Sequence, residues 1–133
     1  MKHAGSCLCG AVRFEVDGDF DGFFLCHCSR CRKGAGSAHA SNLFSSGAKL
    51  VWLSGEEKVR RYDVEGTRHQ RAFCSACGSA APRVNPLGGV VVPAGSLDTA
   101  LDVRPTAHIC CASRANWDAD LESVPKFDGL PGQ

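Results

Sequence analysis

The cysteines of this chain gather in three clusters, and their spacing constrains the fold more than any other feature. The chain has nine cysteines in 133 residues. Seven of them lie in short runs, namely Cys7 and Cys9, then Cys26, Cys28 and Cys31, then Cys74 and Cys77. Thiolates at such separations are typical zinc ligands, and zinc takes about four ligands in a tetrahedron. The fold must therefore bring distant cysteines together.

Cysteine count and charge indicate the class of protein. An odd number of cysteines argues against a complete disulfide framework, and the first six residues lack the apolar run of a secretory signal. We therefore expect reduced cysteines and a cytoplasmic protein. With 15 basic and 14 acidic side chains, no general attraction to nucleic acid is encoded. No apolar run approaches the roughly 18 residues that span a bilayer. Nothing in the sequence indicates an oligomeric state.

Hydrophobic periodicity predicts a mainly β fold. Val12, Phe14 and Val16 alternate with polar residues, which is typical of a strand with one solvated face. Further strands are expected at 23–25, 39–44, 50–53 and 55–62, and a brief helical turn capped by Ser29 is expected before Gly36. The length suits one domain over residues 1–133. We predict a single zinc-containing domain of twisted antiparallel sheets with short helical turns.

The seven clustered cysteines divide into four plus three. Two distant pairs joined into a closed four-thiolate site would make a structural metal, and the remaining triple would keep an open, catalytic-type position. Zinc held by three thiolates carries a net charge of −1 and favours a thiol as its fourth ligand. An alternative zinc ribbon would join Cys28 and Cys31 to Cys74 and Cys77. A redox-active pair is disfavoured because no βαβ pattern surrounds either C-x-x-C motif.

Polar residues near the triple are candidates for substrate binding. Arg30, Arg32 and Lys33 flank the predicted metal and could meet the carboxylates of an anionic substrate, although a solvated basic turn explains them equally well. Ser37 could hydrogen-bond a substrate, or could serve only the turn.

The histidines have less decisive contexts. His27 lies between two predicted ligands and would point away from the metal in extended backbone, which favours a structural role. His108 could shuttle a proton near neutral pH, or could be a hydrogen-bonded residue that fixes a strand. His3, His39 and His69 have no context that distinguishes them from surface residues.

The C-terminal third supplies two further expectations. Cys110 and Cys111 are adjacent, so on a strand they would face opposite sides, one in the core and one exposed. Trp117 and Phe127 are expected to pack against the body and hold the C-terminal segment down.

The motifs together resemble the glutathione-dependent formaldehyde-activating enzyme family, which includes centromere protein V. The resemblance covers nearly the whole chain. It rests on Cys-Leu-Cys-Gly-Ala-Val at 7–12, Cys-His-Cys-Ser-Arg-Cys-Arg-Lys-Gly-Ala-Gly-Ser at 26–37, Phe-Cys-Ser-Ala-Cys-Gly-Ser at 73–79, Gly-Ser-Leu-Asp at 95–98, Pro105, His108-Ile109, Trp117 and 125–127.

This resemblance implies a zinc-dependent, mainly β protein with two zinc ions per chain. The structural zinc would match Cys7, Cys9, Cys74 and Cys77, and the catalytic zinc would match Cys26, Cys28 and Cys31. The implied activity joins glutathione to formaldehyde as S-hydroxymethylglutathione, a carbon–sulfur lyase reaction written in reverse. Substrate-binding candidates are Arg30, Arg32, Ser37 and His108.

The leading hypothesis is therefore a zinc enzyme that acts on an adduct of a small thiol, such as glutathione, and a small aldehyde. Two competitors remain: a protein that binds thiols at the same open metal without turnover, and a structural zinc module that binds another protein. A side chain completing the triple would favour the structural module.

Overall fold

Residues 1–132 fold into three β-sheets and one short helix. The structure, a computed structural model, describes residues 1–132. The strands in this range are β1 (Lys2–Ser6), β2 (Arg13–Asp17), β3 (Gly22–Cys26), β4 (Ala40–Ser45), β5 (Lys49–Ser54), β6 (Val59–Asp63), β7 (Gln70–Cys74), β8 (Arg83–Val84), β9 (Val90–Pro93) and β10 (Ala107–Ile109). The helix α1 spans Ser29–Ala35, and 3₁₀ turns lie at Glu56–Lys58, Ala94–Ser96, Cys111–Ser113 and Leu121–Ser123. The prediction of a mainly β fold with short helical turns is confirmed.

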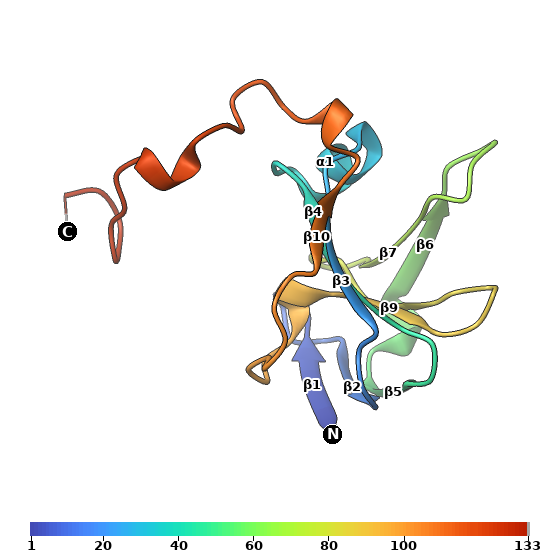
Figure 1. Ribbon diagram of the computed structural model, residues 1–133. Coiled ribbons are helices and arrows are strands. Elements are labelled where there is room, and N and C mark those ends of the chain that lie inside the picture. The colour runs from blue at the N-terminus through green and yellow to red at the C-terminus, as the bar shows by residue number, and fades with distance from the viewer. Residues whose placement is uncertain (133) are drawn as a thin grey trace.

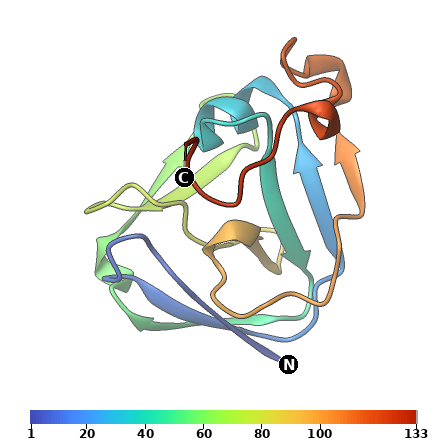
Figure 2. The same ribbon diagram turned by 90° about the vertical axis from the view of Figure 1, so that its left-hand side faces the viewer.

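The sheets have the strand orders β1-β2-β5, β10-β3-β4-β9-β8 and β6-β7. Figure 1 shows β1, β2 and β5 at the base of the molecule, with the five-stranded sheet rising above them. Figure 2 shows β3, β4 and β10 side by side, with the β1–β2 hairpin crossing below. β1 and β2 pair antiparallel across the short connection 7–12, and β3 and β4 pair antiparallel across the longer connection 27–39, which contains α1.

The main core lies between the two larger sheets. Phe14 and Val16 from β2 meet Leu43 from β4 and Val90 and Val92 from β9, and all five side chains are buried. The predicted alternation along β2 is confirmed, since its buried residues are the apolar ones. Burying each of these side chains stabilises the fold by about 1.5 to 3 kcal/mol.

One strand pair departs from the antiparallel pattern. β10 runs parallel to β3, with Ala107 opposite Phe24 and Ile109 opposite Cys26, and Figure 2 shows both arrows pointing the same way. Parallel strands need a long connection, and here most of the chain lies between the two. The pairing places the residues after β10 beside the end of β3, where the cysteine triple begins.

Two local predictions were wrong. Residues 55–62 do not form one strand, because Gly55 adopts φ 76° and starts a 3₁₀ turn before β6. The cap of α1 is Cys28 rather than Ser29: the Cys28 Sγ accepts a hydrogen bond from the Cys31 N–H at 3.3 Å. Gly36 ends the helix as expected, with φ 63°.

The C-terminal segment also differs from expectation. After β10 the chain runs out from the body as an extended arm (Figure 1). Trp117 and Phe127 are 59% and 62% exposed, so neither packs the segment down as predicted. The prediction for Cys110 and Cys111 was wrong too: both are exposed, because the strand ends at Ile109 and Cys110 turns the backbone with φ 56°.

Among residues 1–132, no helix has the length and apolar character needed to cross a membrane.

Candidate metal centres

The first cysteine cluster joins the start of the chain to a turn far along it. The sulfurs of Cys7, Cys9, Cys74 and Cys77 all lie within 4.8 Å of one another. The Sγ atoms of Cys7 and Cys9 are 3.5 Å apart, and those of Cys9 and Cys74 are 4.0 Å apart. Tetrahedral zinc with bonds of roughly 2.3 Å separates its sulfur ligands by about 3.8 Å. The four thiols therefore fit a zinc ion, and the structure does not group Cys74 and Cys77 with the Cys28 cluster as a zinc ribbon would.

Two tight turns position these four sulfurs. Cys7 and Cys9 lie in the turn between β1 and β2, not in an extended strand, and the Gly10 N–H donates to the Cys7 carbonyl at 3.1 Å. Cys74 ends β7, and the Gly78 N–H donates to its carbonyl at 2.7 Å with φ 78° at Gly78. That left-handed conformation favours glycine, so the C-x-x-C-G pattern is explained by the geometry of the turn.

Burial and hydrogen bonds differ among the four thiols. Cys7 and Cys74 are buried, whereas Cys9 is exposed. Hydrogen bonds from the side chain and backbone of Ser79 lower the pKa of Cys77 to about 5. The Ser79 hydroxyl also accepts from the Leu8 N–H at 2.9 Å, so it links the two turns of the site.

The second cluster lies where β3 passes into α1. The sulfurs of Cys26, Cys28 and Cys31 lie within 4.8 Å of one another, and within residues 1–132 no further histidine, cysteine or acidic ligand atom joins them at that distance. Burial raises the pKa of Cys31, as do the neighbouring thiols of Cys26 and Cys28. Three thiolates so close together repel one another, and a soft divalent cation such as zinc would relieve that repulsion. The donor set therefore fits a zinc ion with three protein ligands.

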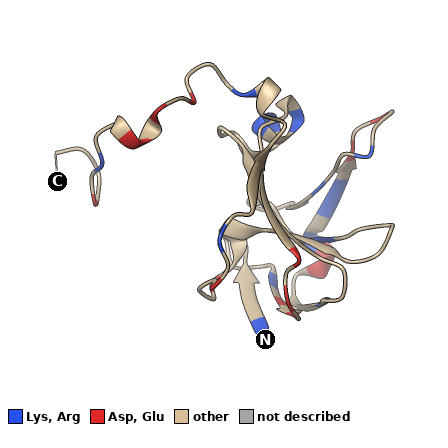
Figure 3. Cartoon of the chain, in the orientation of Figure 1, with Lys and Arg blue, Asp and Glu red and all other residues tan. Residues whose placement is uncertain are grey.

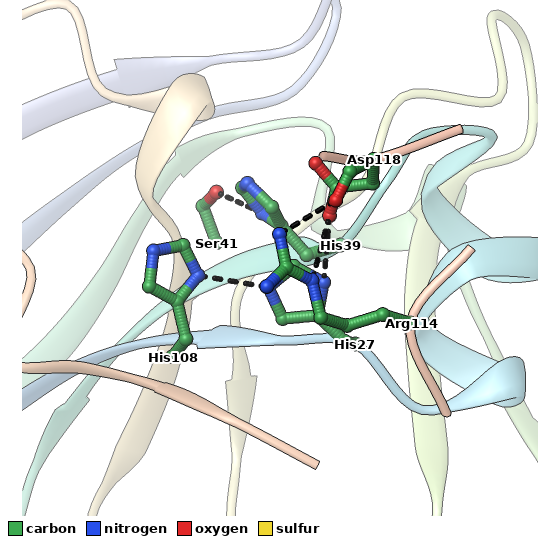
Figure 4. Close-up of polar contacts among 6 residues, drawn as sticks. All are labelled: His27, His39, Ser41, His108, Arg114 and Asp118. Carbon is green, nitrogen blue, oxygen red and sulfur yellow. Dashed lines mark hydrogen bonds and ion pairs between the residues drawn. The ribbon is translucent and has the colours of Figure 1, made fainter. Parts of the chain in front are cut away.

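Three histidine rings, those of His27, His39 and His108, lie in contact with one another at this junction (Figure 4). His27 is fully buried and is not part of the sulfur cluster. Its Nε2 lies 2.8 Å from Nδ1 of His108, and its Nδ1 lies 3.2 Å from Oδ2 of Asp118. Burial lowers the pKa of His27, and the adjacent His39 ring, 5.1 Å away between centroids, lowers it further. His27 thus ties the β3–α1 junction to β10 and to the arm, in agreement with its expected structural role.

Asp118 is the arm residue that makes this connection. It is 7% exposed, and the guanidinium of Arg114 contacts it through Nε at 3.5 Å. Arg114 also donates to the Asp118 carbonyl at 2.6 Å. The sequence analysis overlooked both residues, since neither lies in a recognisable motif.

The predicted substrate residues are dispersed. Arg30 is exposed and lines a cavity beside Cys31. Arg32 is partly buried, Ser37 is exposed, and neither lines that cavity. His108 is exposed on β10 and bonded to His27. A role in substrate binding stays a prediction for all four.

His3 and His69, which the sequence did not distinguish from surface residues, both have specific positions in the structure. His3 is 3% exposed and packs against Phe20, with ring centroids 4.9 Å apart. His69 lines the cavity beside Cys31. Cys110 is near the triple as well, and its side chain interacts with that of Cys26. Tertiary pairing alone brings these residues into place.

The chain is similar to known proteins over most of its length. Residues 2–113 match the family model described as glutathione-dependent formaldehyde-activating enzyme. A protein of Halomonas elongata named "Putative glutathione-dependent formaldehyde-activating enzyme" is 34% identical over 147 residues, covering 100% of this chain and 91% of that protein. A crystal structure of a Rhodobacter sphaeroides protein superposes with a TM-score of 0.57 at 26% identity, covering 81% of this chain and 99% of that one.

Proposed function

The chain belongs to the glutathione-dependent formaldehyde-activating enzyme family, and from that membership we propose that it joins a thiol such as glutathione to formaldehyde. The reaction makes S-hydroxymethylglutathione, and its reverse is a carbon–sulfur lyase reaction. We propose two zinc ions per chain, a structural ion held by Cys7, Cys9, Cys74 and Cys77, and a catalytic ion held by Cys26, Cys28 and Cys31. The nine free cysteines suit a reducing compartment, so the proposal includes a cytoplasmic location.

The observation that carries this proposal is the three-sulfur cluster. Three ligands leave one tetrahedral position for a substrate, whereas four ligands close the site. When bound there, zinc supplies a positive charge that lowers the pKa of a thiol ligand from its usual value of about 8.5. In the overall reaction the thiol sulfur forms a bond to the aldehyde carbon, the carbonyl π bond breaks, and the thiol proton ends on the former carbonyl oxygen.

The chain's own residues hold and orient this site. Cys28 caps α1 through its sulfur, which fixes the position of Cys31 relative to Cys28. The buried His27 holds the intervening backbone, and its N–H donates to the Ile109 carbonyl at 2.9 Å. A rigid cluster of this kind contributes mainly by positioning the thiol for attack.

The test is the exchange rate between free formaldehyde and its glutathione adduct, measured by magnetisation-transfer NMR with and without zinc-loaded protein. We expect the protein to accelerate exchange, Cys28→Ser to abolish the acceleration, and Cys111→Ser, which removes an exposed thiol outside both clusters, to leave it unchanged. Thiols also add to formaldehyde without an enzyme, so every rate is compared at equal thiol.

The competing functions predict different results. If the protein binds glutathione but the exchange rates with and without protein are equal, the result supports a protein that binds thiols without turnover. If the metal at the triple has a fourth protein ligand and no glutathione binds, the result supports a structural zinc module that binds another protein.

A further inference from the structure

A basic cavity lies against the three-sulfur cluster. It has a volume of about 130 Å³ and is lined by residues of α1, β4 and β7 and by Ala80, Ala81, Arg83 and Pro93, with Cys31 in its wall. About 10 to 15 Å³ of such space suffices for one water molecule, so the cavity admits a much larger group. Its titratable lining consists of Arg30, Arg71, Arg83 and His69 beside Cys31, with no acidic side chain.

The three arginines of this cavity have no acidic partner. Within residues 1–132, the ion pairs involve Arg114, Lys126 and His27, and none reaches the cavity arginines. Arg83 is partly buried, and burial lowers its pKa. Burial of the His69 ring likewise lowers its pKa, and the nearby arginines add to the effect. A half-buried guanidinium without a counter-ion is costly, so the cavity is electrostatically suited to an anion.

Arg71 is held in place by its surroundings. Its guanidinium lies over the Phe73 ring, 5.7 Å from the centroid. It also packs against α1 at Gly34, where a Cβ atom would lie only 3.0 Å from the Arg71 Nε. Gly34 therefore makes room for the guanidinium beside the helix that carries Cys31. Figure 3 shows basic residues along α1 and β6, the strand that pairs with β7.

The metal site alone does not balance these charges. Zinc with three thiolates has a net charge of −1, whereas the cavity has three guanidinium groups. One negative charge therefore leaves an excess of positive charge in the cavity, which an anionic ligand would offset.

We propose that Arg71 and Arg83 bind a carboxylate of the thiol substrate, so that the cavity selects anionic thiols for the position beside Cys31. This inference rests on one part of the proposed function, the binding of a thiol at the three-sulfur site, and does not require that the protein catalyses the reaction. The guanidinium fork matches a carboxylate through paired hydrogen bonds. In this proposal the arginines on β7 and β8 determine which thiols bind, while the three cysteines hold the metal that binds the thiol sulfur.

The experiment is calorimetric titration of zinc-loaded protein with two thiols, glutathione and its diethyl ester. The ester keeps the thiol and loses both carboxylate charges. We expect glutathione to bind about tenfold or more tightly than the ester, the range of a charged hydrogen bond. Arg83→Gln and, separately, Arg71→Gln should remove most of this preference by weakening glutathione binding alone. Arg104→Gln, an exposed arginine outside the cavity, should leave both affinities unchanged.

Equal affinity of the unaltered protein for the two thiols would overturn the inference, and so would binding of neither. Arginine variants that weaken both thiols equally would also overturn it, since they would show that the arginines serve the metal or the fold. Zinc content and circular dichroism identify any variant that fails to fold, and the other arginine variant then decides. Formaldehyde exchange is measured separately: a charge preference without accelerated exchange would refute the proposed function and leave this inference standing.

Discussion

Removing one ligand from each cysteine cluster should have very different effects on stability. We compare Cys74→Ser with Cys28→Ser, two changes with the same chemistry. Cys74 is fully buried and packs with Cys7 and Val12 in a small core. Cys28 is partly exposed at the start of α1. We expect Cys74→Ser to unfold much of the protein, and Cys28→Ser to keep the fold while losing one zinc ion.

The expected loss of stability depends on the length of the loop between the cysteines that each metal site links. A link from Cys7 to Cys74 closes a loop of about 70 residues, and loop-closure entropy makes such a link worth about 4 kcal/mol. The same relation gives about 2 kcal/mol for the short loop from Cys26 to Cys31. Total stability is roughly 5 to 15 kcal/mol for a domain, and structural zinc binding is worth roughly 10 to 16 kcal/mol in small zinc modules. Loss of the long-range site therefore removes a large part of the folding free energy.

The assay combines zinc content per chain with urea unfolding followed by tryptophan fluorescence. The unaltered protein should contain two zinc ions per chain. Cys28→Ser should contain one and keep a cooperative transition close to that of the unaltered protein. Cys74→Ser should show no cooperative transition, or a transition whose free energy of unfolding is several kcal/mol lower than that of the unaltered protein.

Equal behaviour of the two variants would refute this reasoning. If both unfold, the triple is also structural. If neither unfolds, the link between the two turns contributes little, and the sheets alone stabilise the fold. Cys111→Ser, which changes an exposed thiol in neither cluster, controls for the chemistry of the substitution.

Three further substitutions test individual contacts of the fold. Asp118→Asn removes the carboxylate that contacts His27 at 3.2 Å; hydrogen exchange in residues 110–130 should accelerate without loss of zinc, and unchanged exchange would contradict the proposed anchor. Gly5→Ala places a Cβ against the Phe14 ring and 2.8 Å from a backbone oxygen; this overpacking should cost about 1 to 3 kcal/mol in urea unfolding, and an unshifted midpoint would contradict it. Hydrogen bonds from Ser46 lower the pKa of Asp21, so this carboxylate stabilises the fold above its unfolded pKa of about 3.9 and loses the effect as pH falls through its folded pKa. Asp21→Asn should therefore lose less stability than the unaltered protein between about pH 6 and about pH 3, and equal losses would exclude this contribution.

Local sequence patterns predicted much of the site. The alternation from Val12 to Val16 predicts β2, and the structure confirms it. The spacing of seven cysteines favoured a group of four and a group of three over a zinc ribbon, and the structure brings together the sulfurs of those two groups. That these groups bind zinc, and that the triple is catalytic, stay predictions.

The rest depended on contacts between distant segments. The arm was expected to pack through Trp117 and Phe127, yet its anchor is Asp118, whose partner His27 lies about 90 residues earlier. Arg71 and Arg83 stand beside Cys31 only because β7 and β8 reach the same cavity as α1. Neither arginine belongs to a motif, so local spacing could not identify them.

The sequence by itself determined which cysteines lie close enough along the chain to be neighbouring ligands, because ligand spacing within a short turn is a local property of the backbone, whereas the tertiary structure decided that the pair at Cys7 and Cys9 meets the pair at Cys74 and Cys77. The tertiary structure alone decided what surrounds those sulfurs: the basic cavity, the buried histidine behind the triple, and the exposed arm. These features arise from strand pairing across long separations, including the parallel pairing of β10 with β3. Such pairing is set by the packing of the whole core, and no short stretch of residues encodes it.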